Sequence, residues 1–280
     1  MNILTSIDKM QSQSRQWRAE GLKIGFVPTM GNLHDGHLKL VEIARQHADR
    51  VVVSIFVNPL QFGPNEDFSR YPRTLDADVA GLKQFSVEAV FAPDEQQFYD
   101  RERDKMCFVE VPGLSDLHCG ASRPKHFRGV TTVVNKLFNI VQPDVAIFGC
   151  KDYQQLTIIR QMVKDLSMPI ELIGVETIRE PDGLAMSSRN QYLSAEQRVL
   201  AASLYKCLQN MRSLILQENE SFAAICANSI TELNGLGFRV DYLQICDAET
   251  LQALSQKATQ MVILAAVYLG KTRLIDNILV

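Results

Sequence analysis

The sequence predicts an α/β protein, with a parallel sheet in the first two-thirds of the chain and a smaller α+β domain after it. Strand-like and helix-like segments alternate up to about residue 176, which is the order of a parallel sheet with right-handed crossovers. The run at 51–57 is almost entirely apolar and β-branched, as is typical of a strand covered on both faces. Beyond this region helical stretches come first and strand-like runs follow. These patterns predict a Rossmann-like domain at 1–176 and a smaller, lid-like α+β domain at 177–280.

The elements of the first domain follow from its apolar runs. Strands are expected at 23–28, 51–57, 88–92, 144–149 and 170–175. Helices are expected at 36–49, 74–85, 128–141 and 152–166. Ligands of parallel sheets bind beyond the carboxyl ends of the strands. The segments that directly follow the strands are therefore where a functional site is expected.

The second domain shows a different order of elements. Ser194 is expected to begin a long helical stretch, because Glu196 and Gln197 stand in its first turn. A second helical segment covers about 220–234, and strand-like runs follow at 238–246 and 260–269, with a short final strand. The turn-rich stretch 179–183 is the expected joint between the domains.

Composition excludes several classes of protein. The chain has 280 residues, 46% of them hydrophobic, and a net charge of -3, so nothing indicates nucleic acid as a partner. The first ten residues do not resemble a signal peptide, and the apolar run at 261–269 is too short for a bilayer, so we expect a cytoplasmic protein without membrane contact. Six cysteines without a CxxC pair favour reduced thiols. A metal cluster of His118, Cys119 and His126 is an alternative, but it lacks a fourth ligand.

The segment Pro28–His37 is the most informative stretch of the chain. It reads PTMGNLHDGH and stands between an apolar strand and a predicted helix. Glycines let a ligand approach the backbone closely, and a helix start offers free N–H groups and a dipole that favours anions. Imidazole can donate to a phosphate oxygen, so the pattern indicates a nucleoside triphosphate. A metal pair on the two histidines is the alternative, although zinc pairs on helices usually sit four residues apart.

Two later segments carry similar chemistry. Gly149-Cys150-Lys151-Asp152 follows a strand, so Lys151 can face phosphates while Asp152 caps a helix, holds a ribose hydroxyl or contacts a magnesium-bound water. Met186-Ser187-Ser188-Arg189-Asn190 offers two hydroxyls and a guanidinium that can wrap a polyphosphate. Each has a plainer interpretation, as an exposed cation beside a helix cap.

Further polar residues allow two interpretations. Gln61 and Gln155 can hydrogen-bond a polar substrate, although exposed glutamines are common. The segment Arg123–Arg128 forms a basic patch in a presumed loop, which contacts phosphates or only decorates the surface. Asp76 and Asp78 are expected on a solvated helix face, with a magnesium contact as the less favoured alternative.

Six motifs in this order resemble one family. PTMGNLHDGH, FVNPLQF, YPRT, HFRGV, FGCKDYQQ and GLAMSSRN are similar to the pantothenate synthetase (pantoate–β-alanine ligase) family, and the resemblance covers essentially the whole chain. That family belongs to a nucleotidylyltransferase-like group that shares the HIGH signature, to which His34–His37 corresponds. Met186–Arg189 is similar to the KMSKS signature, but its lysines are absent. Lys151 and Arg189 are therefore expected to carry more of the cationic role.

The resemblance implies a two-step reaction that uses ATP and Mg²⁺. The pantoate carboxylate attacks the α-phosphorus of ATP, and the amine of β-alanine then attacks the acyl carbon of pantoyl adenylate. His37 is implied as the proton donor and His34 as a phosphate contact, with Lys151, Ser187, Ser188 and Arg189 also catalytic. The implied ATP-binding residues are Met30, Gly31, Asn32, Leu33, His34, Asp35, Gly36, His37, Gly149, Cys150, Lys151, Asp152, Ile178, Met186, Ser187, Ser188 and Arg189. The implied substrate-binding residues are Gln61, Gln155, Asn58, Arg123 and His126.

The resemblance also implies a homodimer and a magnesium ion held mainly by phosphates, without a named protein ligand. We expect the stretch 58–73 to close over the pocket and to keep water from the acyl adenylate. From residue chemistry alone, two alternatives stay open. One is a simple nucleotidylyltransferase, and the other is a nucleotide sensor that binds ATP without turnover.

Overall fold

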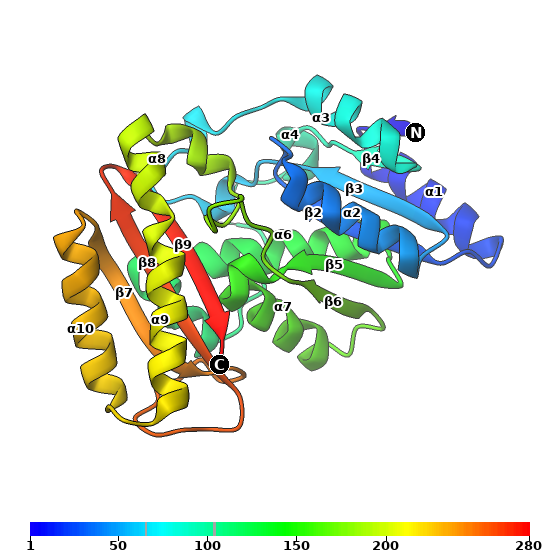
Figure 1. Cartoon of the computed structure of the whole chain (residues 1–280). Helices are drawn as coiled ribbons and strands as arrows, with labels where there is room; N and C mark the ends of the chain where they lie inside the picture. The colour runs from blue at the N-terminus through cyan, green and yellow to red at the C-terminus, as the bar shows by residue number, and fades with distance from the viewer. Residues whose placement is uncertain (65, 103–104) are drawn as a thin grey trace. The chain divides into compact units, whose positions relative to one another are not determined.

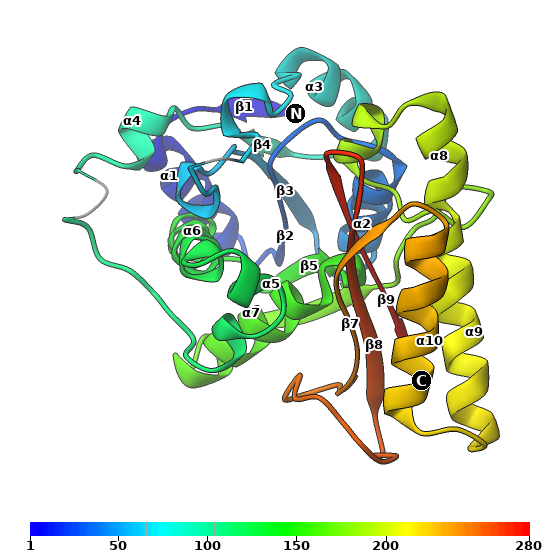
Figure 2. The same cartoon turned by 90° about the vertical axis from the view of Figure 1, so that its left-hand side faces the viewer.

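The protein comprises two compact units (Figures 1 and 2). The computed structural model describes residues 1–64, 66–102 and 105–280. The larger unit contains residues 1–115, 123–150 and 155–176, and the smaller unit contains 116–122, 151–154 and 177–280. Two short segments from the first part of the chain thus pack with C-terminal residues. The contiguous domains 1–176 and 177–280 stay a prediction.

A six-stranded parallel sheet forms the centre of the larger unit, which confirms the predicted fold class. Its strand order is β1-β4-β3-β2-β5-β6. The strands are β1 (Asn2–Leu4), β2 (Ile24–Thr29), β3 (Arg50–Ile55), β4 (Ala89–Phe91), β5 (Val145–Gly149) and β6 (Glu171–Val175). The chain runs from β2 through β3 to β4 on one side and places β5 on the other. The sheet therefore has its switch point between β2 and β5, where ligands of such sheets bind.

Helices cover both faces of this sheet. They are α1 (Ile7–Ala19), α2 (Asp35–His47), α3 (Leu75–Leu82), α4 (Glu95–Phe98), α6 (His126–Val141) and α7 (Tyr153–Asp165), the last of which begins with two residues of the smaller unit. Helix α2 packs Leu40, Val41 and Ala44 into a core with alternate residues of β2, β3 and β5. Helices α1 and α6 lie side by side on the opposite face, where Phe26 of β2 meets Phe138 (Figure 2).

The sequence did not predict β1 or α1. Strand β1 is only three residues long, and Ile3 is half exposed at the sheet edge, so no apolar run marks it. Helix α1 is mostly polar and buries only Met10, Ser14 and Trp17. The basic segment 123–128 is also not all loop, because α6 begins at His126.

The smaller unit is a three-stranded antiparallel sheet covered by helices, as expected of an α+β domain. Its strands are β7 (Arg239–Asp247), β8 (Met261–Leu269) and β9 (Thr272–Leu279), and its helices are α5 (Cys119–Ser122), α8 (Ala195–Ala201), α9 (Ser203–Gln217) and α10 (Phe222–Gly235). The long helix expected from Ser194 is in fact two, since α8 ends before Ala202 and α9 follows. The final strand has eight residues and is not short. The turn at 179–183 lies in this unit, close to Thr177 where its last segment begins, and its role as the joint between domains stays a prediction.

Strand β8 is apolar along its whole length because both of its faces are covered. Ile263, Ala265 and Val267 pack with α9 and α10, which cross one face of the sheet (Figure 1). Leu264 and Ala266, on the other face, are equally buried. Their β-partners Asn277 and Tyr242 hydrogen-bond the segments 151–154 and 116–122, so these two segments cover that face.

Two general features bear on the composition-based predictions. All six cysteines are free thiols. Among the described residues, no helix combines the length and the hydropathy that a membrane span requires.

Candidate active site

The histidine segment joins β2 to α2 at the carboxyl edge of the sheet, as predicted. Gly31 and Asn32 adopt left-handed backbone conformations, with φ of 81° and 51°. His34 is the N-cap of α2, and His37 is the third residue of the helix. The glycine is needed at this turn, because a Cβ at position 31 would lie 3.0 Å from both Asp78 Oδ2 and Ile55 Cγ2. The first turn of α2 therefore starts directly beyond the sheet edge, with its N–H groups at the ligand-binding end.

The two histidines lie against each other at the start of the helix. Their ring centroids are 4.1 Å apart. The backbone N–H of His34 donates to Nδ1 of His37 over 3.3 Å. A nitrogen that accepts cannot carry the proton of a neutral imidazole, so His37 holds its proton on Nε2. The capping contact thus prepares His37 Nε2–H as a hydrogen-bond donor.

Asp78 fixes the loop that carries the histidines, and the expectation of a solvated position for it is wrong. Its side chain is buried, with 4% of the residue exposed. Oδ2 accepts the backbone N–H of Asn32 at 3.0 Å, and Oδ1 accepts that of Leu33 at 2.8 Å. The hydroxyl of Thr74 donates to Oδ2 at 3.2 Å. Asp76, its neighbour in the same turn, is exposed as expected.

We expect Asp78→Ala to destabilise the protein by about 2–4 kcal/mol, because two partly buried N–H groups lose their acceptor. Ligase activity should fall about tenfold, since the turn at Gly31 and Asn32 is no longer held. Chemical denaturation and steady-state rates measure the two effects. Asp76→Ala is the matched control, and we expect a change within about 0.5 kcal/mol. Equal effects of the two variants would contradict this role of Asp78.

Asn58 lies beneath Gln61, in the segment after β3. Only 1% of Asn58 is exposed, and Nδ2 donates to Gln61 Oε1 and to the Gly129 carbonyl, both at 3.1 Å. Its Oδ1 accepts the Leu60 N–H at 3.2 Å and the Tyr99 hydroxyl at 2.9 Å. These four bonds use every donor and acceptor of the side chain. Asn58 therefore orients the side chain of Gln61, and its direct contact with pantoate stays a prediction.

The 3₁₀ turn η1 (Pro59–Gln61) sits unusually close to helix α6. A Cβ at Gly129 would lie 2.2 Å from the carbonyl oxygen of Leu60, a distance that no real contact allows. Gln61 Nε2 lies 2.9 Å from the Met30 sulfur. Gly129 belongs to the HFRGV motif. Nothing in the sequence indicates its role, because Gly129 and Leu60 are about seventy positions apart along the chain.

Arg123 and His126 hold the backbone of Gln61. Arg123 pairs with both oxygens of Glu66, at 2.6 Å from Nε and 2.5 Å from NH2. NH2 also donates to the Gln61 carbonyl at 3.3 Å. His126 Nδ1 lies 2.8 Å from the same carbonyl, and its Nε2 lies 3.0 Å from Arg123 NH1. This pattern fits a neutral His126 with its proton on Nδ1, because a carbonyl only accepts and a guanidinium only donates.

Burial by itself would raise the pKa of the Glu66 carboxyl, but the hydrogen bonds and charge of Arg123 hold its pKa below the ordinary value of 4.5. A carboxyl with a lowered pKa stabilises the fold above its unfolded pKa, and that contribution is lost as the pH falls through the folded pKa. We expect Glu66→Gln to destabilise the protein at pH 7 and the difference from the parent to shrink below about pH 4.5. Denaturation at several pH values measures this. A difference between Glu66→Gln and the parent that stays the same below about pH 4.5 would contradict the prediction.

The residues after β5 make different contacts from one position to the next. Cys150–Asp152 form the 3₁₀ turn η5, which leads into α7. Gln154 is buried and bonds the 117–119 segment at both ends, through Leu117 O at 2.8 Å and Cys119 N at 3.1 Å. Lys151 Nζ lies 3.8 Å from the carboxylate of Asp152, too far for a strong ion pair. Gln155 is partly buried in the first turn of α7.

The segment 178–189 is a hairpin followed by a capped turn, all within the smaller unit. Met186 N donates to Ile178 O at 3.0 Å, and Glu180 N donates to Leu184 O at 2.8 Å. Ser187 then caps the 3₁₀ turn η6 (Ser188–Tyr192), because its Oγ accepts the N–H of Arg189 at 3.3 Å. From the sequence, Ile178 and Met186–Arg189 were two separate predictions. The hairpin places Ile178 beside Met186.

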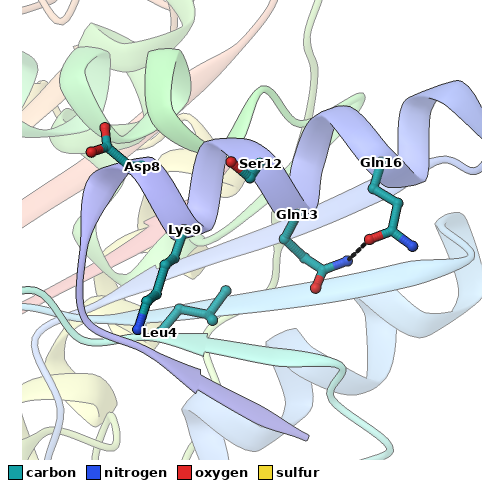
Figure 3. A pocket seen from close by; sticks show the side chains of 6 residues that line it. All are labelled: Leu4, Asp8, Lys9, Ser12, Gln13 and Gln16. Carbon is teal, nitrogen blue, oxygen red and sulfur yellow. Dashed lines mark hydrogen bonds between the residues drawn. The ribbon is translucent and has the colours of Figure 1, made fainter.

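A shallow depression on α1 is separate from all of these residues (Figure 3). It is lined by Leu4, Asp8, Lys9, Ser12, Gln13 and Gln16. Gln13 Nε2 donates to Gln16 Oε1 over 3.5 Å, and both side chains extend from the same side of α1 (Figure 3). None of its residues belongs to the predicted site. The described residues contain no group of three or more histidine, cysteine or acidic side chains suited to a metal ion.

The parallel sheet and the histidine loop beyond its carboxyl edge define an α/β enzyme of the Rossmann-like, nucleotide-binding class. Comparison with known proteins narrows this class. A family model described as Pantoate-beta-alanine ligase matches residues 2–279, so the chain belongs to that family and ligates pantoate and β-alanine.

Relatives and solved structures agree with this membership. The pantothenate synthetase of Alteromonas mediterranea is 51% identical over 278 residues, which cover 99% of each chain. That of Shewanella sp. strain ANA-3 is 55% identical, covering 97% of this chain and 96% of the relative. The crystal structure of pantothenate synthetase from Thermus thermophilus matches with a TM-score of 0.91 and 45% identity over 99% of each chain. A Francisella tularensis pantoate-beta-alanine ligase, complexed with beta-gamma ATP and beta-alanine, matches with a TM-score of 0.84 and 35% identity, covering 100% of this chain and 97% of the other.

Proposed function

We propose that this chain ligates pantoate to β-alanine through a pantoyl-adenylate intermediate. In the first step, a carboxylate oxygen of pantoate bonds to the α-phosphorus of ATP, and the bond to the bridging oxygen breaks to release pyrophosphate. In the second step, the neutral amine of β-alanine bonds to the acyl carbon, AMP leaves with the carboxylate oxygen, and the amine nitrogen releases one proton as the amide forms. The products are pantothenate, AMP and pyrophosphate.

The observation that carries this proposal is the histidine pair at the start of α2. A carboxylate is already a nucleophile, so the first step needs in-line positioning and neutralisation of the charge on the phosphoryl oxygens. His37 Nε2–H is a donor held in place by the backbone of His34. The N–H groups at the start of α2 add a partial positive charge. Donors aimed in advance at developing charge are the largest single source of catalysis in many enzymes.

The other predicted residues take complementary roles in this proposal. Lys151 and Arg189 supply positive charge for the triphosphate, and Ser187 and Ser188 supply hydroxyl donors. The remaining ATP contacts are backbone and side-chain groups of Met30–Asp35, Gly36, Gly149, Cys150, Asp152, Ile178 and Met186. Gln61 and Gln155 bind pantoate. The support for Gln61 is its fixed orientation between Asn58 and Met30.

Arg123 and His126 act on Gln61 through its backbone in this proposal. Both hold the Gln61 carbonyl, and Arg123 also ties down the chain at Glu66. We therefore assign them, together with Asn58, to the positioning of the substrate-binding turn. The proposed closure of 58–73, of which residue 65 lies outside the described residues, predicts slower proteolysis of this stretch with the intermediate bound. Equal protection with and without the intermediate would contradict closure.

We propose that Mg²⁺ accompanies ATP and is held mainly by its phosphates. This ion keeps several waters and uses one or two carboxylates beside substrate phosphates. Asp152 is an exposed carboxylate next to Lys151 and fits such a contact, directly or through water. When bound, the ion would neutralise phosphate charge. The homodimer remains a proposal that rests on the resemblance, and light scattering in solution tests it. The cytoplasmic location remains a proposal that rests on the sequence composition.

An isotope experiment tests the route directly. Pantoate labelled with ¹⁸O in both carboxylate oxygens should yield AMP with one label and pantothenate with one label in its new amide. Mass spectrometry of both products measures this transfer. Unlabelled AMP formed alongside pantothenate, or formation of ADP in place of AMP, would contradict attack at the α-phosphorus.

Lys151→Ala tests the cationic role of the segment after β5. We expect ATP affinity and turnover each to fall about tenfold, because one charge-assisted contact to the phosphates is lost. Titration of ATP and steady-state kinetics measure the two quantities. Lys39→Ala, on the exposed side of α2, is the control and should change neither. Unchanged affinity and turnover in Lys151→Ala would assign this lysine to the surface only.

A further inference from the structure

Two neighbouring residues of β9 hold both segments of the smaller unit that the proposed function assigns to ATP. Asn277 Nδ2 donates to the backbone carbonyl of Lys151 at 2.9 Å. Asp276 accepts two N–H groups of Arg179, from NH1 at 2.7 Å and from NH2 at 2.9 Å. Arg179 stands at the base of the hairpin that leads into Ser187–Arg189.

One strand can reach both segments because successive side chains point to opposite faces of a sheet. Asp276 pairs with Ala265, which belongs to the core under α9. Arg179 lies on that same side, with its guanidinium 3.5 Å from the ring centroid of Tyr205 in α9. Asn277 pairs with Leu264 and faces the other side of the sheet, where Lys151 lies.

The contacts of Asp276 are those of a rigid support. Its side chain is 3% exposed and that of Arg179 is 16% exposed, so solvent screens this bidentate pair only weakly. Arg179 also donates to the Gly183 carbonyl at 3.1 Å, and so ties the tip of the hairpin to the sheet. Asp276 Oδ1 accepts the N–H of Asn277 at 2.8 Å, which links the two supports to each other.

We propose that Asp276 and Asn277 are positioning residues of the ligase. They fix the backbone of Lys151 and the hairpin before Ser187–Arg189 on one strand, so that the cations and hydroxyls of the smaller unit keep a constant spacing. Groups that are already in place cost no reorganisation when charge develops on the phosphates. This inference rests on the proposed function, because it assumes that Lys151 and Arg189 serve ATP.

The primary test is a double-mutant cycle of Asn277→Ala with Lys151→Ala, measured by exchange of labelled pyrophosphate into ATP in the presence of pantoate. Asn277→Ala alone should lower the exchange rate about tenfold, with the KM of pantoate changed less than about twofold. Lys151→Ala keeps its own backbone carbonyl and therefore keeps the bond to Asn277. If Asn277 acts through the lysine side chain, Asn277→Ala should cost less than about twofold further in the Lys151→Ala background.

Ser229→Ala provides a control for simple loss of stability. Ser229 is a buried polar residue of α10 in the same unit, away from the segments that Asp276 and Asn277 hold. We expect this variant to lower the melting temperature about as much as Asn277→Ala does, and to leave exchange unchanged. Asp276→Asn is a second, isosteric variant that tests the hairpin arm. It should raise the KM of ATP more than the KM of pantoate.

The outcomes separate the inference from the function beneath it. Loss of exchange in Asn277→Ala that disappears in the Lys151→Ala background supports the inference. The inference is overturned if Asn277→Ala lowers the exchange rate by the same factor in the Lys151→Ala background as in the parent. It is also overturned if Asn277→Ala and Asp276→Asn both exchange at the parent rate while Lys151→Ala is impaired. Either result leaves the proposed function intact. Full activity of Lys151→Ala overturns the assigned role of Lys151 and this inference together.

Discussion

Replacing His37 with alanine is expected to lower kcat about 10²–10³-fold, or roughly 3–4 kcal/mol of transition-state stabilisation. The reason is the loss of one donor, Nε2–H, which the backbone of His34 keeps in its tautomer and orientation. Negative charge on the phosphoryl oxygens grows as the pantoate carboxylate attacks. The contact therefore strengthens in the transition state, and ATP affinity should change much less than kcat.

Two companion variants sharpen this prediction. His47→Ala removes an exposed imidazole from the last turn of the same helix and should leave kcat unchanged. His37→Gln keeps an N–H donor near the place of Nε2 and should recover part of the lost rate. Single-turnover measurements separate chemistry from product release. An unimpaired kcat in His37→Ala would remove this histidine from the mechanism.

Replacing Gly129 with alanine is expected to cost more than about 3 kcal/mol of stability and about 10²-fold in ligase activity. The added Cβ would lie 2.2 Å from the Leu60 carbonyl oxygen, and backbone on both sides leaves no flexible side chain to move aside. Turn η1 must shift away from α6, and Asn58 then loses its bond to the Gly129 carbonyl. Gln61 moves with that turn, so the loss should fall most heavily on the KM of pantoate.

Gly81→Ala is the matched control for this variant. Gly81 is also a helical glycine of the larger unit, but a Cβ there would meet nothing within 4 Å. An alanine in such a helix stabilises by about 0.5–1 kcal/mol, so Gly81→Ala should be neutral or slightly more stable. Similar behaviour of the two variants in denaturation and kinetics would contradict the close approach of η1 and α6.

Much of the fold could be predicted because apolar runs report burial directly. The strands at 24–29, 50–55 and 145–149 are buried on both faces, and their expected bounds lie within two residues of the observed ones. Strand β1 was not predicted because it has only three residues at the edge of the sheet. Helix α1 was not predicted because it is mostly polar and buries only three side chains. The break between α8 and α9 was not predicted either. Ala202, the residue between them, is itself a good helix former, so no residue type marks the break.

The candidate site was predictable where it is local in sequence. The histidine loop and the turn before α7 follow single strands, so their glycines and cations could be placed by spacing alone. The residues that hold these segments in place could not be predicted. Each of them contacts a segment far away along the chain, and they are Asp78, Gly129, Asp276 and Asn277. An aspartate in a first turn is usually a solvated residue, and only the fold reveals that Asp78 is buried against the loop.

Pantoate-dependent exchange of labelled pyrophosphate into ATP, measured without β-alanine, tests the central claim most directly. Attack of a carboxylate on the α-phosphorus predicts exchange that requires pantoate alone, and amide formation when β-alanine is then added. A nucleotidylyltransferase would give no amide, and a nucleotide sensor would give no exchange. Exchange that needs β-alanine, or that proceeds without pantoate, would contradict an acyl-adenylate route for this enzyme.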